Sequence, residues 1–319
     1  MTPSIKNSSD GTEVKCPSCS GDSIGEEVIE SVDLINLWKS QEVDVSHLFE
    51  SEKIEKKRCL NCGLGFYYPF VLGDNGFYST LACWDWYYKH GGKTEYEYTK
   101  KLLKQGMRVL DVGCGIGEFS EYMPNDVSFC GAELSSKSVE IAKSFGRNVQ
   151  QMDVVKSLSL ISSKFDVVTS FQVLEHISDI NTFFEALVDA CRPGGLVVIA
   201  VPNNDSFISR AVNNNLNMPP HHVLLWNKKS LYSLADRYSL AVEAYLEEDV
   251  SDVHLVWYWA VILNYYLSKL MFGKLKSVDL SFGSKLTRKI SFIMAKLVSK
   301  VFQPKGVGHS SVVVFRKGC

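Results

Sequence analysis

A stretch of nine residues, Val109 to Gly117, constrains the fold of this chain more than any other segment. It begins as a short apolar run, breaks into three glycines at alternate positions, and leads into a stretch with helical character. A glycine turn between a strand and a helix brings a ligand against bare backbone, at the positive end of the helix dipole. The next apolar run ends at Glu133, where a carboxylate can accept both hydroxyls of a ribose. The pattern therefore predicts a site for a cofactor that contains a nucleoside.

From Arg108 onward, apolar runs alternate with helical stretches such as Ser135–Phe145 and Ile180–Cys191. This alternation predicts an α/β fold, a Rossmann-like doubly wound sheet. Seven strands are expected: Val109–Val112, Val127–Glu133, Val149–Met152, Phe165–Phe171, Gly195–Pro202, Val242–Glu247 and Ser311–Phe315. A basic helical insertion, about 253–303, separates the last two strands.

The glycine spacing argues against a nicotinamide cofactor, because that fingerprint needs a third glycine where this chain has Glu118. The spacing Gly-x-Gly-x-Gly after an acidic strand residue resembles the signature of class I S-adenosylmethionine-dependent methyltransferases. Further motifs follow in that family's order: Glu133, Asp153, the strand Phe165–Val168 with its continuation Leu174–Ile177, and Pro193-Gly194-Gly195 before an apolar strand. The resemblance covers roughly residues 100–317.

The resemblance implies S-adenosylmethionine as cofactor and assigns roles to residues of this chain. Asp111 would hold the glycine loop or the ammonium group, Glu133 the ribose, and Asp153 the adenine. Phe171 and Gln172 would lie beside the methionine moiety. The full predicted cofactor site is Asp111, Gly113, Cys114, Gly115, Gly117, Glu133, Leu134, Asp153, Val154, Phe171 and Gln172.

Four of the nine cysteines form two Cys-x-x-Cys pairs, Cys16 with Cys19 and Cys59 with Cys62. Two such pairs can supply four thiolates to one Zn²⁺ ion in a tetrahedral site. Four thiolates leave no open coordination position, so the zinc would be structural. The alternatives are four unrelated thiols or a redox pair.

The organisation predicted from these features is a zinc ribbon over residues 1–70, an aromatic-rich helical linker over 71–104, and a methyltransferase domain over 105–319. The ribbon followed by Arg58–Pro69, then aromatics and a methyltransferase core, resembles a recurrent bacterial arrangement. Its members are often associated with biosynthesis of polysaccharides or other small molecules.

Methyl transfer to a hydroxyl requires removal of a proton, and a histidine of ordinary pKa is the natural base. The candidates are His176, just past the predicted fourth strand, and the pair His221 and His222. Each could instead be a structural histidine, and the sequence does not rank them.

Charge is distributed unevenly along the chain. From Val253 to Cys319 there are eleven Lys and Arg against one acid, Asp279, whereas the whole chain has a formal charge of −2. Residues 284–302 also predict an amphipathic helix with lysines along one flank. This region could contact an anionic membrane as a peripheral element, cap the substrate pocket, form a homodimer face, or be a solvated lysine surface.

The N-terminus lacks the apolar core of a signal peptide, and we expect a cytoplasmic protein with or without membrane association. The predicted function is methyl transfer to a hydroxyl of a small molecule, with a sugar or a glycan or lipid-linked intermediate as the leading acceptor. One alternative is an RNA or protein acceptor recruited by the ribbon, although the ribbon shows no broad basic stripe for nucleic acid. Another is a regulator that binds the cofactor without catalysis.

Overall fold

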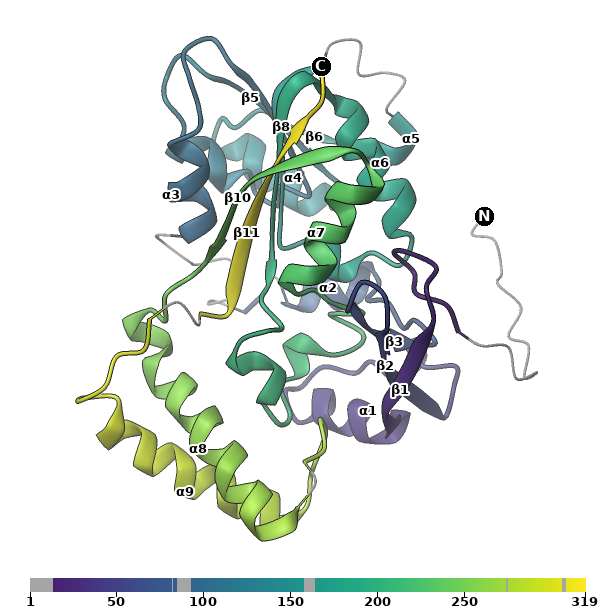
Figure 1. Ribbon diagram of the computed structural model, residues 1–319, viewed down its shortest axis with the longest axis vertical. Coiled ribbons are helices and arrows are strands. Elements are labelled where there is room, and N and C mark those ends of the chain that lie inside the picture. The colour runs from purple at the N-terminus through teal and green to yellow at the C-terminus, as the bar shows by residue number, and fades with distance from the viewer. Residues whose placement is uncertain (1–13, 82, 85–92, 158–163, 274, 306–307) are drawn as a thin grey trace.

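The computed structural model describes residues 14–81, 83–84, 93–157, 164–273, 275–305 and 308–319. Its central element is a sheet in the strand order β10-β11-β8-β7-β4-β5-β6 (Figure 1). These strands are β4 (Arg108–Val112), β5 (Ser128–Glu133), β6 (Val149–Gln151), β7 (Phe165–Phe171), β8 (Cys191–Pro202), β10 (Leu240–Glu247) and β11 (Ser310–Lys317). The predicted α/β class and seven-stranded sheet are confirmed.

Five neighbouring strands, from β8 to β6, run parallel, and β11 lies antiparallel between β8 and β10. The carboxyl ends of β4, β5, β6 and β7 therefore meet at one edge of the sheet. In open α/β sheets this is the edge at which ligands bind.

Each face of the sheet is covered by its own hydrophobic core. On one face, side chains of the central strands pack against helices α6 (Ile180–Ala190) and α7 (Lys228–Arg237). On the other, Val109 and Val198 pack with Tyr96 from α3 (Thr94–Lys100) and with Phe119. Two further helices, α4 (Ser136–Ser144) and α5 (Val154–Ser157), follow β5 and β6.

A second, smaller sheet has the order β1-β2-β3-β9, with β1 (Ser23–Glu30), β2 (Lys53–Cys59), β3 (Gly65–Tyr68) and β9 (Leu224–Leu225). The first three strands come from the N-terminal part, together with α1 (Ser31–Lys39) and α2 (Asn75–Leu81). The fourth comes from a distant part of the chain: Phe66 pairs with Leu224 and Gly65 with Leu225.

The N-terminal segment also shares its hydrophobic core with the larger sheet. Leu64 and Phe66 belong to the same buried cluster as Trp226 and Leu231. The predicted boundaries at residues 70 and 105 stay a prediction, and residues 1–13 and 85–92 lie outside the described ranges.

The predicted helical insertion is present between β10 and β11. It consists of α8 (Leu255–Phe272) and α9 (Phe282–Val298), which pack against each other as a hairpin at the end of the molecule opposite the chain's C-terminus (Figure 1). Within the ranges that the structure describes, none of the helices has the length and apolarity needed to cross a bilayer.

Candidate functional site

The glycine loop after β4 has the backbone conformation that its sequence predicts. Gly113, Gly115 and Gly117 have φ of 74°, 55° and 71°, in the left-handed region that favours glycine. A Cβ atom on Gly113 would also lie only 2.5 Å from a methyl carbon of Val173. The loop therefore presents bare backbone at the carboxyl edge of the sheet.

The carboxylate of Glu133 lies directly at this loop. Its Oε2 accepts a hydrogen bond from the Gly115 N–H at 2.9 Å, and its Oε1 accepts one from the Ser135 N–H at 2.8 Å. Each oxygen keeps a second lone pair with which a ribose hydroxyl could bond. The predicted ribose-binding acid and the predicted glycine cradle are thus in contact.

Asp111 lies under the loop and is buried. The Thr169 hydroxyl donates to its Oδ1 at 2.7 Å. Burial raises the pKa of Asp111 to about 7, and the hydrogen bond from Thr169 and the nearby Lys93 oppose this effect. A cation bound beside this carboxylate would favour its ionised form.

The other predicted cofactor residues lie along the same edge. The Cys114 side chain packs against Gly131, and a Cβ atom on Gly131 would lie 2.5 Å from the Cys114 sulfur. Leu134 is 66% exposed, an apolar side chain open to a ligand at the end of β5. Asp153 Oδ1 accepts hydrogen bonds from the N–H groups of Val155 and Lys156 in α5, and Val154 is buried.

Two residues at the end of β7 complete the predicted set. Phe171 packs against the rings of Tyr96 and Phe119, with centroids 5.4 and 5.2 Å away. Gln172 has φ of 57°, an uncommon conformation for a residue with a side chain, and such strain often marks functional positions. Its amide donates to the Ser310 hydroxyl at 3.0 Å.

The four N-terminal cysteines converge. Their sulfurs lie within 4.8 Å of one another, with Cys16 to Cys62 at 3.6 Å and Cys19 to Cys59 at 3.5 Å. A Zn–S bond of about 2.3 Å places the sulfurs of a tetrahedral site about 3.8 Å apart, so the spacing fits a zinc ion. Burial raises the pKa of the Cys19 thiol, but hydrogen bonds from the Gly21 backbone and the other thiols lower it to about 7.

The cysteine cluster is docked on the larger sheet's helices. The Asn181 side chain of α6 donates to the Pro17 carbonyl at 3.1 Å, and Arg237 of α7 donates to the Ser18 hydroxyl at 3.3 Å. The Asn227 amide, at the N-terminus of α7, donates to the Gly63 carbonyl at 2.8 Å. The turns around both cysteine pairs are therefore fixed to the domain that holds the glycine loop.

The three predicted histidines come together as one cluster. A ring nitrogen of each of His176, His221 and His222 lies within 4.8 Å of those of the other two. His176 follows β7, whereas the pair precedes β9, so the smaller sheet helps to hold the pair in place. Burial lowers the pKa of His176 to about 4 and lowers the pKa values of His221 and His222 well below 6.5.

Two buried acids at this edge were not predicted from the sequence. Glu175 is 1% exposed, and burial raises its pKa to about 8. Glu95 on α3 is 5% exposed, and burial raises its pKa as well. Glu175 is part of the motif that carries the resemblance, but nothing in its local sequence signals burial; Glu95 sits in a polar and aromatic stretch that has no clear periodicity.

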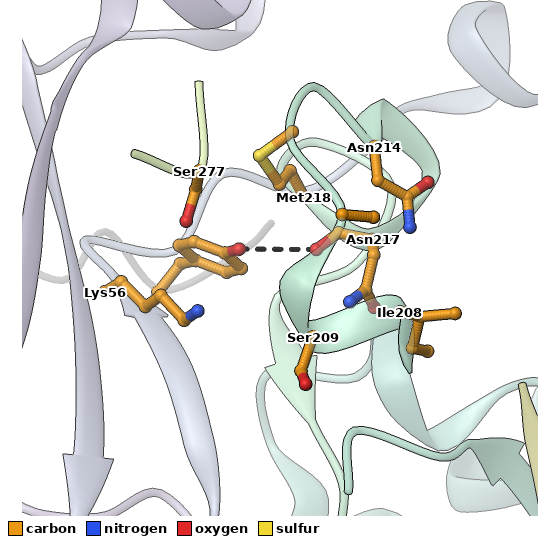
Figure 2. A pocket seen from close by; sticks show the side chains of 9 residues that line it. Lys56, Ile208, Ser209, Asn214, Asn217, Met218 and Ser277 are labelled. Carbon is orange, nitrogen blue, oxygen red and sulfur yellow. Dashed lines mark hydrogen bonds between the residues drawn. The ribbon is translucent and has the colours of Figure 1, made fainter. Parts of the chain in front are cut away.

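A small cavity lies where the smaller sheet, the loop before His221 and the connection between α8 and α9 meet (Figure 2). Its volume is about 20 Å³, room for about one water molecule, and its walls include Lys56, Asn217 and Ser277. The Tyr67 hydroxyl donates a hydrogen bond to the Asn217 carbonyl at 3.3 Å. This cavity is too small for an acceptor and belongs to the packing of the loop.

Comparison with known proteins agrees with this geometry. Residues 92–245 match a family model described as a methyltransferase domain, a span that includes the glycine loop, Glu133 and the three histidines. Together with the Rossmann-like sheet, this match indicates that the protein carries a methyltransferase domain.

Solved structures with the same kind of fold are distant. An S-adenosylmethionine-dependent methyltransferase from Archaeoglobus fulgidus is 19% identical, with a TM-score of 0.44, and the match covers 70% of this chain and 94% of that one. The YcgJ protein from Bacillus subtilis is 17% identical, with a TM-score of 0.45 and coverage of 70% and 98%. No curated protein matches the sequence.

Proposed function

We propose that this enzyme transfers the methyl group of S-adenosylmethionine to a hydroxyl of a small molecule, with a sugar or glycan intermediate as the leading acceptor. The observation that carries the proposal is the contact between the glycine loop and Glu133 inside the matched domain. The loop backbone and Asp111 would hold the methionine part, Glu133 the ribose, and Leu134 and Asp153 the adenine. The bound sulfonium supplies the electrophile, so the protein's task is to position the acceptor.

The electrostatics of the smaller sheet support a small acceptor over RNA. Three of the four basic residues of β2 are paired with acids: Lys53 lies 3.5 Å from Glu30, Lys57 lies 2.6 Å from Glu55, and Arg58 pairs with Glu26. The first cysteine turn is held against α6 and α7 through Pro17 and Ser18. A nucleic-acid surface normally presents unpaired positive charge along a stripe.

The general base stays a prediction. A base with a pKa near 4, as for His176, accepts a proton weakly at neutral pH. A positive group beside the acceptor would lower the pKa of its hydroxyl and so reduce the need for a strong base.

We also propose that the cysteine cluster holds a structural zinc ion. Four sulfurs at near-tetrahedral spacing support this, as does the close packing of the turn at Gly21, where a Cβ would lie 2.9 Å from that of Asn61. With four thiolates the ion would have no open position for catalysis.

The acceptor class can be tested with methyl-labelled S-adenosylmethionine. We expect label to enter a fraction of nucleotide sugars and lipid-linked glycans from the source cells, and to enter neither total RNA nor protein. A variant unable to bind the cofactor provides the background. Label found only in RNA or protein would contradict this proposal and favour an RNA or protein acceptor recruited by the N-terminal zinc ribbon.

The helical hairpin supports a further proposal, that it lies on an anionic membrane surface. On α9 the small side chains face α8, and Ser268 donates to Thr287 at 3.1 Å across the interface. The large apolar side chains face outward: Leu286, Ile290, Ile293 and Leu297 are 40–67% exposed. Small residues between helices and large apolar residues outside are typical of helices whose surroundings are lipid.

The charges around this apolar face favour anionic lipid as its partner. Exposed lysines flank the face at positions Lys285, Lys289, Lys296 and Lys300. Each lysine near an anionic leaflet contributes about 1 kcal/mol, and each buried aliphatic side chain about 1.5–3 kcal/mol. Both terms favour contact of this face with an anionic membrane surface over exposure to water.

A double change of Ile293→Asp and Leu297→Asp is expected to weaken binding to phosphatidylglycerol vesicles at least about a hundredfold, because two anchoring side chains become charged. Co-sedimentation measures the effect, with phosphatidylcholine vesicles as the lipid control. Val32→Asp is the matched control, since Val32 is 58% exposed but belongs to α1 and not to either helix of the hairpin. Light scattering tests whether the apolar face instead contacts a second copy of the chain. The membrane proposal would be contradicted if the unaltered protein formed a dimer that the double change dissociates and did not bind vesicles.

A further inference from the structure

The histidine cluster includes a fourth group, the carboxylate of Glu175. Its Oε1 lies 3.9 Å from His176 Nε2 and 3.8 Å from His222 Nε2. Neither oxygen of Glu175 has a hydrogen-bond partner among the described residues, although the side chain is almost fully buried. A buried carboxylate without a partner is costly and requires an explanation.

The Nδ1 atom of each of the three imidazole rings, on the side away from Nε2, faces an oxygen acceptor. His176 Nδ1 faces the His221 carbonyl at 2.5 Å, and His221 Nδ1 faces the Leu216 carbonyl at 2.8 Å. A carbonyl can only accept, so both Nδ1 atoms carry the proton. A neutral ring protonated at Nδ1 has its lone pair on Nε2.

The third ring is oriented by an amide. His222 Nδ1 faces Asn217 Oδ1 at 3.2 Å, and the Nδ2 of the same amide donates to Asn204 Oδ1 at 2.8 Å. This second bond fixes which end of the Asn217 amide is the oxygen, so His222 also donates through Nδ1. Rings held by an N–H bond to an oxygen on the far side are typical of histidines that bind a metal.

We propose that His176, His221, His222 and Glu175 form a second metal site, for a divalent first-row transition ion. Three imidazoles and one carboxylate are a donor set that such ions accept, whereas Mg²⁺ and Ca²⁺ prefer oxygen alone. A bond of about 2.0–2.1 Å to the ion places donor atoms about 3.3 Å apart in a tetrahedral site. The contacts of Glu175 with His176 and His222 therefore need to close by about 0.5 Å, and the histidine nitrogens by up to about 1.5 Å.

The surrounding structure supports a site built for an ion. The Val223 N–H donates to the Glu175 carbonyl at 2.9 Å, which ties together the two segments that supply the ligands. The His176 side chain is 17% exposed, so the cluster has an opening toward solvent. The site is distinct from the cysteine cluster, which offers only sulfur.

The test is a metal count on the full-length chain, with the cysteine cluster as an internal reference. We expect about two ions per chain in the unaltered protein, and about one in Glu175→Gln and in His222→Gln. His47→Gln is the matched control, because His47 also contacts a carboxylate, Asp74 at 3.0 Å, but lies outside the cluster. A second ion that persists in both Glu175→Gln and His222→Gln would place it elsewhere and overturn the assignment.

A second measurement starts from the unaltered protein, so it does not depend on whether Glu175→Gln and His222→Gln fold. Protein with its cysteine cluster filled is titrated with Co²⁺ alone, and we expect one further ion with nitrogen and oxygen ligands and no thiolate-to-cobalt absorption. Asn217→Ala, which removes the acceptor behind His222, is expected to weaken this Co²⁺ binding by about 10- to 100-fold. No uptake of Co²⁺ by the unaltered protein overturns the proposal, whatever the outcome of the methyl-transfer assays.

Discussion

Gly115→Arg is expected to raise the dissociation constant for S-adenosylmethionine at least about a hundredfold, measured by calorimetry. The new side chain would stand in the loop whose backbone N–H contacts Glu133, where the cofactor needs bare backbone. It also forces a long side chain onto a residue with φ of 55°, which costs about 1–2 kcal/mol.

The matched control is Gly106→Arg. Gly106 has φ of 76°, so the same residue meets the same kind of backbone strain, but a Cβ there meets nothing within 4 Å. Gly106 precedes β4 at the opposite edge of the sheet. We expect the Gly106→Arg variant to bind the cofactor as the unaltered protein does. An equal loss of cofactor affinity in both variants would show that backbone strain, and not the position in the glycine loop, controls affinity. Absence of binding by the unaltered protein would refute the assigned cofactor.

Cys62→Ser is expected to remove about one zinc ion per chain and to lower the melting temperature strongly. Cys62 is 2% exposed and lies in the core shared by the two sheets, so loss of the ion leaves unpaired thiols inside it. Structural zinc in small domains contributes about 10–16 kcal/mol of binding free energy, comparable to the whole stability of a typical domain. Elemental analysis and thermal unfolding followed by circular dichroism measure the two effects.

Cys83→Ser is the control for this experiment. Cys83 is exposed, lies outside the cluster, and its thiol donates to the Ser79 carbonyl at 3.4 Å. We expect its zinc content and melting temperature to match the unaltered protein. A Cys62→Ser variant that keeps its full zinc content would remove the proposed structural site.

The sequence predicts the larger sheet well because its signals are local. Strand β7 begins and ends at the predicted residues, and the glycines of the loop after β4 have the positive φ that their spacing requires. Helix α4 begins one residue after its cap, Ser135, whose side chain accepts from the Ser138 N–H at 3.2 Å. Apolar runs, caps and glycine turns are each readable within about ten residues.

Features that depend on contacts between segments far apart in the sequence could not be predicted from local patterns. Strand β9 has two residues, too few for any periodicity, and its partner Phe66 is far away in the sequence. The stripe of Leu286, Ile290 and Ile293 was predicted, but a helical pattern does not reveal whether its apolar face points inward or outward. Glu175 faces histidines supplied by a second segment, so its environment depends on tertiary structure alone.

The pairing of β3 with β9 also sets the order of events during synthesis. Gly63 and Asn227, which bond at this junction, are 164 residues apart. At 5–20 residues per second the ribosome needs roughly 10–30 seconds to make that length of chain. During this interval the three N-terminal strands have an open edge at β3, and open edges are templates for aggregation. Zinc captured early by the cysteines would keep the nascent segment folded until its last strand emerges.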